Sequence, residues 1–470
     1  MMGRQVEPGQ LFYEFNLERH VPSDHLLRRI DRALDLSWLR AELAPFYSST
    51  GRPSIDPELM IRMLLVGYCY GIRSERRLCD EVHLNLGYRW FCRLGLDGAV
   101  PDHSTFSKAR HGRFREAEVF RRVFEAVVGT CMSTGLVGGE GFAIDASVIE
   151  ADASYAQRIE GSALPPGWSD PVTATRPVRE YLAALDEAAG PVGEASGDQP
   201  PERLVGEPAP AKSLSLTDPA SAWTSKGSRK ACFAYGINYL IDLRRAVVVD
   251  VAATPARRTA EVASTAVMIE RTRERFGLVP SRLAGDAAYG TGLLVSWLRR
   301  QGIEPHVPVL DGEKQKAKAQ GLFGRTDFAF DPARDVYVCP AGHDMITSGH
   351  VVPGGLRQYR AKATSCGPCE LKARCTAGAA RMVTRNIHEA EREHVRQLAG
   401  TPEFKRSARE RRKVEMLFAH LKRHLGFRRL RLRGLTGASD EFLLAATAQN
   451  LRRLARNLPA PPSLSLPTPA

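Results

Sequence analysis

Apolar residues recur with the spacing of amphipathic helices over residues 20–135. Asp56, which is followed by a proline, has the features of a helix start, and an apolar stripe comes directly after it. That stripe consists of Leu59, Met63, Leu64 and Val66. A second helix start is expected at Asp102. The pattern therefore predicts an all-α N-terminal domain at residues 1–135.

Short apolar runs replace this pattern after Gly138 and predict buried strands. The predicted strands cover residues 141–151, 232–242, 246–255, 281–286 and 305–310. Helical patterns between them cover residues 259–276 and 293–301. The order strand, long hairpin, helix, strand, helix, strand predicts an α/β core of the ribonuclease-H-like type.

Two insertions interrupt this predicted core. Residues 156–215 are rich in Pro, Ala, Gly and Glu, and are predicted to be loosely packed. Residues 312–380 carry a cluster of cysteines. Strong helical patterns follow at about 402–425 and 438–457. The predicted order is a helical domain (1–135), the first part of the core (136–311) and the cysteine-bearing insertion (312–380). The last part of the core (381–458) and a disordered tail (459–470) follow.

The charge of the chain points to a polyanionic partner. The net charge is +13 over 470 residues. Between Arg381 and Arg456 there are 19 Lys and Arg against 8 Asp and Glu, so most of the excess lies in the last fifth of the chain. Nucleic acid and an acidic membrane surface both attract such a charge, and a solvated basic face is the alternative. No apolar run reaches membrane-spanning length and the N-terminus lacks a secretory apolar core, so we expect a cytoplasmic, nucleoid-associated protein that binds DNA and no membrane.

Basic residues also lie on the predicted N-terminal helices. They are Arg73, Arg76, Arg77, Lys108, Arg110 and Arg113. Short helices with basic faces are typical of helix-turn-helix-like DNA-binding domains. A plain helical bundle that packs or dimerises fits the same residues equally well.

Three acidic residues stand where an α/β fold places ligand-binding groups. Asp145 and Asp286 each end a predicted strand, and acids there point into the crevice where such sheets bind ligands. Glu415 lies inside a basic helix. Carboxylates are the ligands that Mg²⁺ prefers, and two such ions can stabilise both the attacking and the leaving oxygen in phosphodiester transfer. Taken singly, an Asp after a strand is more often a turn or cap residue.

The helix that carries Glu415 is amphipathic. At about 100° per residue, Arg411 and Lys422 fall within about 60° of Glu415. An apolar stripe on the adjoining face, expected to pack into the core, consists of Val414, Leu417 and Leu421. The helix therefore presents one carboxylate and two cations to the same side, although ordinary ion pairing on a helix surface gives the same pattern.

Together these segments resemble bacterial insertion-sequence DDE transposases, in particular the group named after insertion sequence eleven-eighty-two, near the IS-four and IS-five-like families. The resemblance runs from about Phe15 to Leu458. GFAIDASVIEADAS is similar to the segment of the first Asp, and AGDAAYG to that of the second. Arg411-x3-Glu415-x6-Lys422 matches the signature Tyr-x2-Arg-x3-Glu-x6-Lys, with Ala408 in the place of its ancillary tyrosine.

The resemblance implies that Asp145, Asp286 and Glu415 hold two Mg²⁺ or Mn²⁺ ions, while water and then a 3′-hydroxyl attack phosphorus in line. It implies the terminal inverted repeats of the element and target DNA as partners, and a homodimer in the DNA complex. Phosphate contacts are expected from basic residues of the signature helix, namely Arg411, Arg412, Lys413, Lys422 and Arg423. Tyr289 and Trp223 are candidates for stacking on an unpaired base, with packing as the alternative.

Four of the nine cysteines cluster in the second insertion, as Cys339 followed by Cys366-x2-Cys369-x5-Cys375. A Cys-x2-Cys pair with two further cysteines is typical of a structural zinc site, and His343 is an alternative ligand. Thiols that pack as small apolar groups are the other interpretation, and we expect it for the five scattered cysteines.

Three hypotheses about activity remain open. The first is a transposase that cuts and joins DNA. The second is a ribonuclease-H-like nuclease that hydrolyses without joining, because one site can do both. The third is a catalytically inactive, transposon-derived DNA-binding protein, which the presence of all three acids disfavours.

Overall fold

The computed structural model describes residues 15–48, 50, 54–160, 164–170, 172–189, 213–225, 230–310, 321–352 and 355–458. The chain divides into two compact units. The helical unit contains residues 1–136, 420–427 and 440–470, and the α/β unit contains residues 137–419 and 428–439. The predicted tail at 459–470 lies outside the described residues. Among those described, no helix combines the length and the apolar character needed to cross a bilayer.

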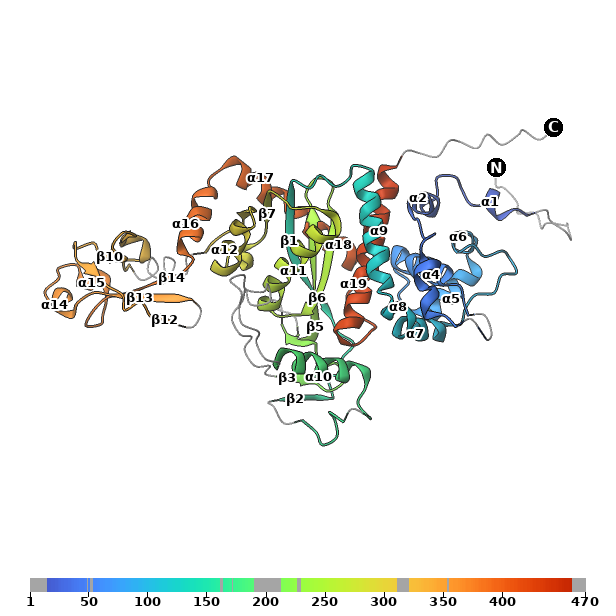
Figure 1. The fold of residues 1–470 in the computed structure, drawn as a ribbon, viewed down its shortest axis with the longest axis horizontal. Coiled ribbons are helices and arrows are strands. Elements are labelled where there is room, and N and C mark those ends of the chain that lie inside the picture. Colours follow the sequence, from blue (N-terminus) through green and yellow to red (C-terminus); the bar gives the residue numbers. More distant parts are fainter. Residues whose placement is uncertain are drawn as a thin grey trace, which may run out of the picture. The chain divides into compact units, whose positions relative to one another are not determined.

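The helical unit begins with short helices, as the sequence predicted (Figure 1). They are α1 Leu17–His20, α2 Leu26–Ala33, α3 Leu39–Leu43, η1 Ala44–Phe46, α4 Pro57–Tyr70, α5 Glu75–Leu84, α6 Leu86–Phe91, α7 His103–His111, α8 Arg113–Glu116 and α9 Val119–Ser133. Asp56 caps α4 by accepting from the Glu58 N–H, and Asp102 caps α7 by accepting from the Ser104 N–H. Both predicted helix starts are therefore confirmed.

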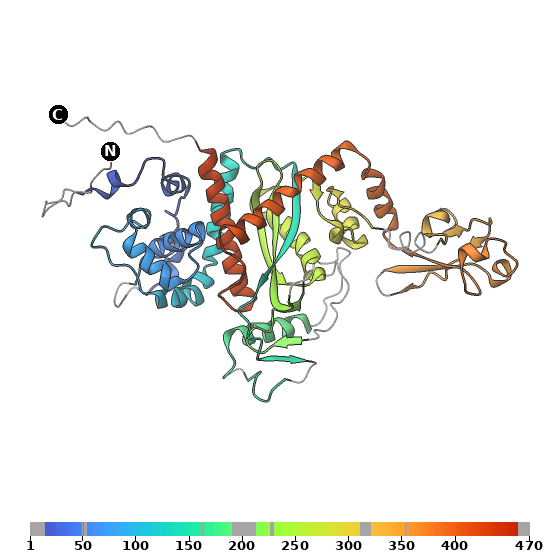
Figure 2. The same cartoon turned by 180° about the vertical axis from the view of Figure 1, so that it is seen from behind.

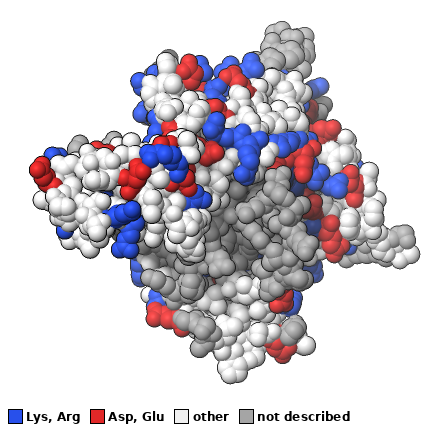
Figure 3. All heavy atoms as spheres, turned by 60° about the vertical axis from the view of Figure 1, so that its left-hand side comes forward, with Lys and Arg blue, Asp and Glu red and all other residues white. Residues whose placement is uncertain are grey.

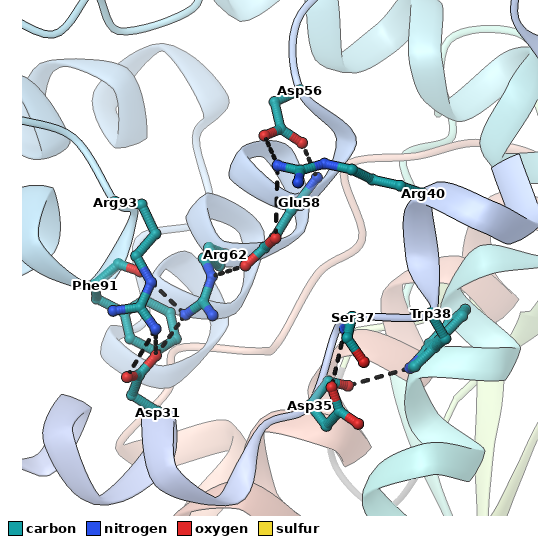
Figure 4. A network of polar contacts seen from close by, with 10 residues as sticks. All are labelled: Asp31, Asp35, Ser37, Trp38, Arg40, Asp56, Glu58, Arg62, Phe91 and Arg93. Atoms are coloured by element: carbon teal, nitrogen blue, oxygen red, sulfur yellow. Dashed lines mark hydrogen bonds and ion pairs between the residues drawn. The ribbon is translucent and has the colours of Figure 1, made fainter. Parts of the chain in front are cut away.

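A buried arginine joins three of these helices (Figure 4). Arg62 of α4 donates to Glu58 at 2.8 Å and to Asp31 of α2 at 2.7 Å. It also donates to the Phe91 carbonyl at the end of α6, at 3.2 Å. Arg93 donates to both carboxylate oxygens of Asp31, at 2.9 and 3.0 Å. Removing one partner would leave this buried charge only partly compensated, so the network favours the observed packing of α2, α4 and α6.

Two of the six basic residues predicted for a DNA-binding face point inward. Arg110 is 5% exposed and pairs with Glu75, and Arg73 pairs with the buried Glu441. Glu441 belongs to the last helix, α19 Gly434–Asn457, so the C-terminal end of the chain completes this unit. These two arginines serve the packing of the unit rather than a surface for DNA.

The α/β unit is built on a six-stranded sheet (Figure 1). Its strands are β1 Gly141–Glu150, β4 Ala222–Thr224, β5 Cys232–Asp242, β6 Val247–Pro255, β7 Arg282–Ala284 and β8 Glu304–His306. The order is β4-β5-β1-β7-β8, and β6 pairs with β5. β5 runs antiparallel to β1, whereas β7 and β8 are parallel to their neighbours. The predicted mixed α/β architecture is confirmed.

Helices cover both faces of this sheet. α11 Arg258–Phe276 and α12 Gly292–Arg300 share one apolar core with β1 and β7, centred on Phe142, Ile144 and Leu283. The opposite face carries α18 Arg412–Arg423, which runs across the strands in Figure 2. Residues that alternate along β1 therefore face two different helical layers. Asp145 faces the α18 side and Ile144 the α11 side.

The first insertion contains more regular structure than its composition predicted. It holds β2 Arg158–Glu160, α10 Arg176–Ala189 and β3 Ser213–Ser215, and β2 pairs with β3. Trp168 anchors the segment by donating to the Leu216 carbonyl at 3.0 Å. The expectation of a loosely packed stretch is wrong for α10, whose alanine-rich sequence favours a helix.

The second insertion forms a small lobe with two three-stranded sheets. Its elements are η4 Arg325–Asp327, β9 Ala329–Asp331, β10 Val336–Val338, β11 Asp344–Met345, β12 Val351–Val352, β13 Leu356–Arg360, α14 Ala363–Cys366, α15 Lys372–Cys375 and β14 Met382–Asn386. Among the described residues of the lobe, six buried side chains form its apolar core, including Tyr337, Tyr359 and Met345. Three of its cysteines pack against this core.

The helix predicted over residues 402–425 is two helices. After α16 Glu389–Leu398, α17 covers Pro402–Glu410 with Arg411 as its C-cap, and α18 begins at Arg412. The Arg411 carbonyl accepts from the Val414 N–H at 2.9 Å, a tighter turn than an α-helix makes. Arg411 therefore stands at the junction of the two helices.

Candidate active site

The two aspartates are placed side by side by the register of parallel strands. β1 and β7 pair through Phe142 with Leu283 and through Ala143 with Ala284. Asp145 and Asp286 each follow two residues after the last of these pairs. Because parallel strands keep equivalent positions next to each other, the two residues lie at the same level of the sheet. Asp286 follows the end of β7, whereas Asp145 lies within β1, which continues to Glu150, so the prediction that Asp145 ends a strand is wrong.

Backbone N–H groups orient both aspartates. The Asp286 carboxylate accepts from the Ala288 N–H at 2.7 Å and caps η3 Ala287–Tyr289. The Asp145 carboxylate accepts from the Ala146 N–H at 2.8 Å. Each of these bonds uses Oδ1 of its carboxylate. Oδ2 of Asp145 faces the Arg411 guanidinium at 3.4 Å.

α18 brings the third carboxylate to this side of the sheet. Phe418 of α18 stacks on Tyr239 of β5, with ring centroids 4.8 Å apart and planes at 20°. Tyr239 is the cross-strand partner of Asp145. Val414, Leu417 and Leu421 are buried as the apolar spacing predicted. Glu415 is thereby left exposed on the outer face, with 54% of its side chain accessible.

Arg411 connects two of the three acids. Its guanidinium donates to Glu415 at 2.9 Å and lies 3.4 Å from Asp145 Oδ2. Among the residues that the structure describes, no three His, Cys, Asp or Glu side chains lie close enough to share one metal ion. Asp145 and Asp286 thus form the fixed part of the carboxylate set. Glu415 reaches it from an exposed helix face through Arg411.

Tyr289 is buried beside the same acids. It is 2% exposed within the apolar core, and its hydroxyl has no hydrogen-bond partner among the described residues. Burial raises the pKa of Tyr289 well above its usual value, and the charges of Asp145, Glu261 and Asp286 raise it further. A ring enclosed in this way offers no face to a base, so the stacking role expected for Tyr289 is corrected to one of packing.

Glu261 is a carboxylate near the site that the sequence did not single out. It lies on α11 above the hairpin of β5 and β6. A Cβ at Gly236 would lie 3.5 Å from Glu261 Oε1, an ordinary contact distance, so the Glu261 carboxylate lies over β5 at this position. No sequence signal marks it, because a Glu in the first turn of a helix is common.

The basic residues of the signature helix have different surroundings. Arg412 is exposed, whereas the Lys413 ammonium donates to the Leu243 carbonyl. Lys413 is therefore held against the sheet instead of facing solvent. Lys422 and Arg423 lie in the end of α18 that groups with the helical unit. On the face drawn in Figure 3, Lys and Arg gather in several groups between acidic residues.

Trp223 is half-buried at the edge of the sheet. Its ring lies 4.9 Å from that of Phe233 and 5.6 Å from that of the exposed Tyr155. Tyr155 had no sequence signal either, because 68 positions of chain separate it from Trp223 and only the fold brings the rings together.

The clustered cysteines line one pocket of the small lobe. Cys339, Cys366, Cys369 and Cys375 all contribute to its wall, together with His343. Burial raises the pKa of the Cys375 thiol, and the neighbouring Cys366, Cys339 and Cys369 raise it further, whereas Arg381 lowers it. The four thiols are therefore neighbours in space, although the first and the last are 36 positions apart in the sequence.

Two families match the chain. One, described as a transposase domain (DUF772), covers residues 15–112, and the other, described as a transposase DDE domain, covers residues 338–455. Both matched domains are transposase domains. They support an insertion-sequence DDE transposase, in agreement with the sequence resemblance, and the DDE domain match includes Glu415, Arg411 and the four clustered cysteines. No solved structure matches.

Proposed function

We propose that this protein is a DNA transposase that cleaves the ends of an insertion sequence and joins them to target DNA at a site formed by Asp145, Asp286 and Glu415. The observation that carries the proposal is the geometry of these residues. Two aspartates stand at equivalent positions of neighbouring parallel strands, and Arg411 links the first of them to Glu415 of the signature helix.

The sheet supports a ribonuclease-H-like core for this enzyme. Three antiparallel strands, in the order β6-β5-β1, are followed by the parallel strands β7 and β8. Helices α11 and α12 connect the later strands on one face. We propose that the core belongs to the group of insertion sequence eleven-eighty-two, on the signature from Arg411 to Lys422.

The carboxylates suit divalent cations in kind, because Mg²⁺ and Mn²⁺ require hard oxygen ligands. Glu415, which pairs with Arg411, would have to move toward the aspartates, since among the described residues no three such side chains are close enough to share one ion. Bound there, such ions would activate the attacking oxygen and stabilise the leaving one. The chain's own residues supply the rest. Asp145 and Asp286 are fixed by backbone N–H groups, and Arg411 offers a cation to the phosphate of the scissile strand. Lys422 and the exposed Arg412 and Arg423 are proposed to contact flanking phosphates.

The test is Mg²⁺-dependent cleavage and joining of DNA that carries the terminal inverted repeats. Asp145→Asn, Asp286→Asn and Glu415→Gln keep the shape of each side chain and remove its charge. We expect each to lower the cleavage rate at least about a hundredfold, or about 2.7 kcal/mol, while DNA binding persists. Glu274→Gln, an exposed carboxylate of α11, is the matched control and should cleave normally.

The same assay separates the other hypotheses. Cleavage without joining of pre-cut ends would favour a nuclease, and binding without cleavage by the wild-type protein would favour an inactive DNA-binding protein. Survival of cleavage in any of the three variants would remove that acid from the site. Because two ends have to meet, we also propose a dimer on DNA, to be checked by light scattering with and without the end DNA.

We further propose that Cys339, Cys366, Cys369 and Cys375 hold a structural Zn²⁺, with His343 as the alternative fourth ligand. The thiols line one pocket, and Cys339, Cys366 and Cys375 pack against the small core of the lobe. Because no three of them stand at metal-ligand spacing in the described part of the chain, the thiols would have to draw together around the ion. A core of six buried residues supplies little stability by itself, so a metal ion would compensate.

Elemental analysis of the purified protein tests this zinc site. We expect about one zinc per chain, and its loss in Cys366→Ser and Cys369→Ser. Cys232→Ser, a cysteine outside the lobe, is the control and should retain zinc. A wild-type protein without zinc that keeps a folded lobe in chelator would overturn the proposal.

A further inference from the structure

We propose that His306 and Ser407 are positioning residues that hold Arg411 beside the acids of the site, because they fasten α17 to the strand next to that of Asp286. This inference rests on the proposed function for the reaction that Arg411 serves. It goes beyond that function by assigning a role to a buried pair of side chains outside the set of acids and basic residues proposed so far.

The pair joins α17 to β8 through one buried hydrogen bond. Nδ1 of His306 in β8 lies 2.7 Å from Oγ of Ser407 in α17, and the two residues are 6% and 0% exposed. The buried positions of α17 are Phe404 and Ser407, and the His306 ring also packs on Phe404, with centroids 5.4 Å apart. A buried polar group costs free energy unless it is bonded, so this hydrogen bond favours one place at which α17 meets the sheet.

Ser407 lies one helical turn before Arg411. Residues four positions apart lie on the same face of a helix. The Ser407 carbonyl accepts from the Arg411 N–H at 2.9 Å, in the turn that ends α17. The Arg411 guanidinium then reaches Glu415 at 2.9 Å and Oδ2 of Asp145 at 3.4 Å. The place of this guanidinium therefore depends on where Ser407 is held.

His306 is also tied to the strand that leads to Asp286. It is the register partner of Ala284, the last residue of β7. Its carbonyl accepts from the N–H of Gly285, the residue before Asp286, at 3.4 Å. His306 thus contacts the strand of an acid through its backbone and the helix that leads to Arg411 through its ring. A single residue therefore links the positions of both groups.

The contacts of α17 with the sheet also include a more exposed ion pair. Arg282 of β7 lies 3.4 Å from Glu410, the last residue of α17, and it pairs with the exposed Glu140 as well. Ion pairs that are open to water contribute little to stability. Burial lowers the pKa of His306 and the charge of Arg282 lowers it further, so the ring is neutral near pH 7 and its Nδ1 can accept from the Ser407 hydroxyl. This neutral, buried bond is therefore the contact to test.

The experiment uses the full chain and measures backbone hydrogen exchange by mass spectrometry together with the single-turnover rate of end cleavage. In Ser407→Ala, which removes only the hydroxyl, we expect exchange at residues 408–415 to become about fivefold faster, as the loss of one hydrogen bond predicts. Exchange in β1 and β5 should stay as in wild type, and cleavage should slow at least about fivefold.

Two substitutions of the histidine test the same bond from its other side. His306→Asn keeps a polar atom near the place of Nδ1 and should retain most of the cleavage rate and of the protection from exchange. His306→Phe keeps the aromatic contact with Phe404 without the ring nitrogens, and it should resemble Ser407→Ala.

A double-mutant cycle separates positioning from general stability. If the pair acts through Arg411, Ser407→Ala should slow cleavage less than about twofold in the Arg411→Gln background. Thr272→Val removes another buried helix hydroxyl, bonded to the Met268 carbonyl at 2.7 Å, and as the matched control it should cleave normally. Normal cleavage by Ser407→Ala, additive losses in the cycle, or unchanged exchange at residues 408–415 would each overturn the role of the pair. Faster exchange there in a protein that never cleaves DNA would support the pair and overturn the proposed function instead.

Discussion

At the scale of single residues, Arg411 is the side chain that joins two of the proposed catalytic acids. Arg411 contacts both Asp145 and Glu415. It sits at the junction of two helices, where its backbone is fixed and its guanidinium is 22% exposed. Such a position favours a functional role over a stabilising one, because a partly exposed ion pair contributes little to folding.

Replacing Arg411 should therefore separate activity from stability. We expect Arg411→Gln to lower the cleavage rate about tenfold or more, about 1.4 kcal/mol, with little change in the urea midpoint. Arg411→Lys keeps the charge without the two-pronged guanidinium and should recover only part of the rate. A variant that unfolds at much lower urea concentration would assign Arg411 to structure instead.

Asp218 is the residue whose charge should make the α/β unit sensitive to pH. It is fully buried and accepts from the Tyr235 hydroxyl and the Gly434 N–H, while its other oxygen has no described partner. Burial raises the pKa of Asp218 from 3.8 to about 6. Between these values the folded state binds more protons than the unfolded chain, so this carboxyl lowers stability as the pH rises from about 4 to 6.

Asp218→Asn should remove that pH dependence. The free energy of unfolding of the variant, relative to wild type, should rise from about pH 4 to pH 6 and then remain level. Urea unfolding at several pH values measures this difference. Parallel profiles for the two proteins would show that Asp218 has an ordinary pKa in the folded state.

At the scale of elements, strand and helix positions in the core followed from the sequence, because short apolar runs and helical spacing record burial directly. β1, β5, β6 and α11 lie within a residue or two of their predicted ranges. The break between α17 and α18 at Arg411 could not be predicted from the sequence, because the helical spacing of apolar residues continues through it. The helix α10 was missed because its surroundings are rich in proline and glycine. The proximity of Tyr155 to Trp223 depends on tertiary pairing, which local pattern does not contain.

The start of α19 supplies a test of backbone conformation. Gly434 has φ +82°, and a Cβ there would lie 2.8 Å from Glu180 Oε2. We expect Gly434→Ala to lose about 1 kcal/mol or more, through both strain and crowding. Gly302 has φ +72° but no atom near its Cβ position, so an alanine there causes backbone strain without crowding. Gly302→Ala should therefore lower the free energy of unfolding less than Gly434→Ala. Equal losses in urea unfolding would mean that Glu180 moves aside freely.

At the scale of the whole molecule, the helical unit is assembled from distant parts of the chain. Glu441 pairs with Arg73, Arg452 donates to the Cys69 carbonyl at 2.9 Å, and Phe427 lies 6.1 Å from Tyr68. The sequence prediction placed these C-terminal segments with the catalytic core. Local patterns could not show the pairing, because it joins residues more than 350 positions apart.

A fragment of residues 1–136 should therefore fold poorly by itself. It lacks the partners of Arg73 and Tyr68 and would expose an apolar face. We expect low helicity and no cooperative melting by circular dichroism, and a gain of both when residues 420–458 are added as a peptide. A cooperative transition in the fragment alone would contradict this.

The helical unit cannot be completed until the C-terminal end of the chain has been synthesised. The helices α2 to α9 leave the ribosome about 300 residues before Glu441 is made. At about 5–20 residues per second, they wait roughly 15–60 s for the helix that completes them. A chain released early would thus carry an N-terminal transposase domain that cannot finish folding. Throughout that interval a nascent chain can also be bound by chaperones, proteases or the C-terminal segments of other copies.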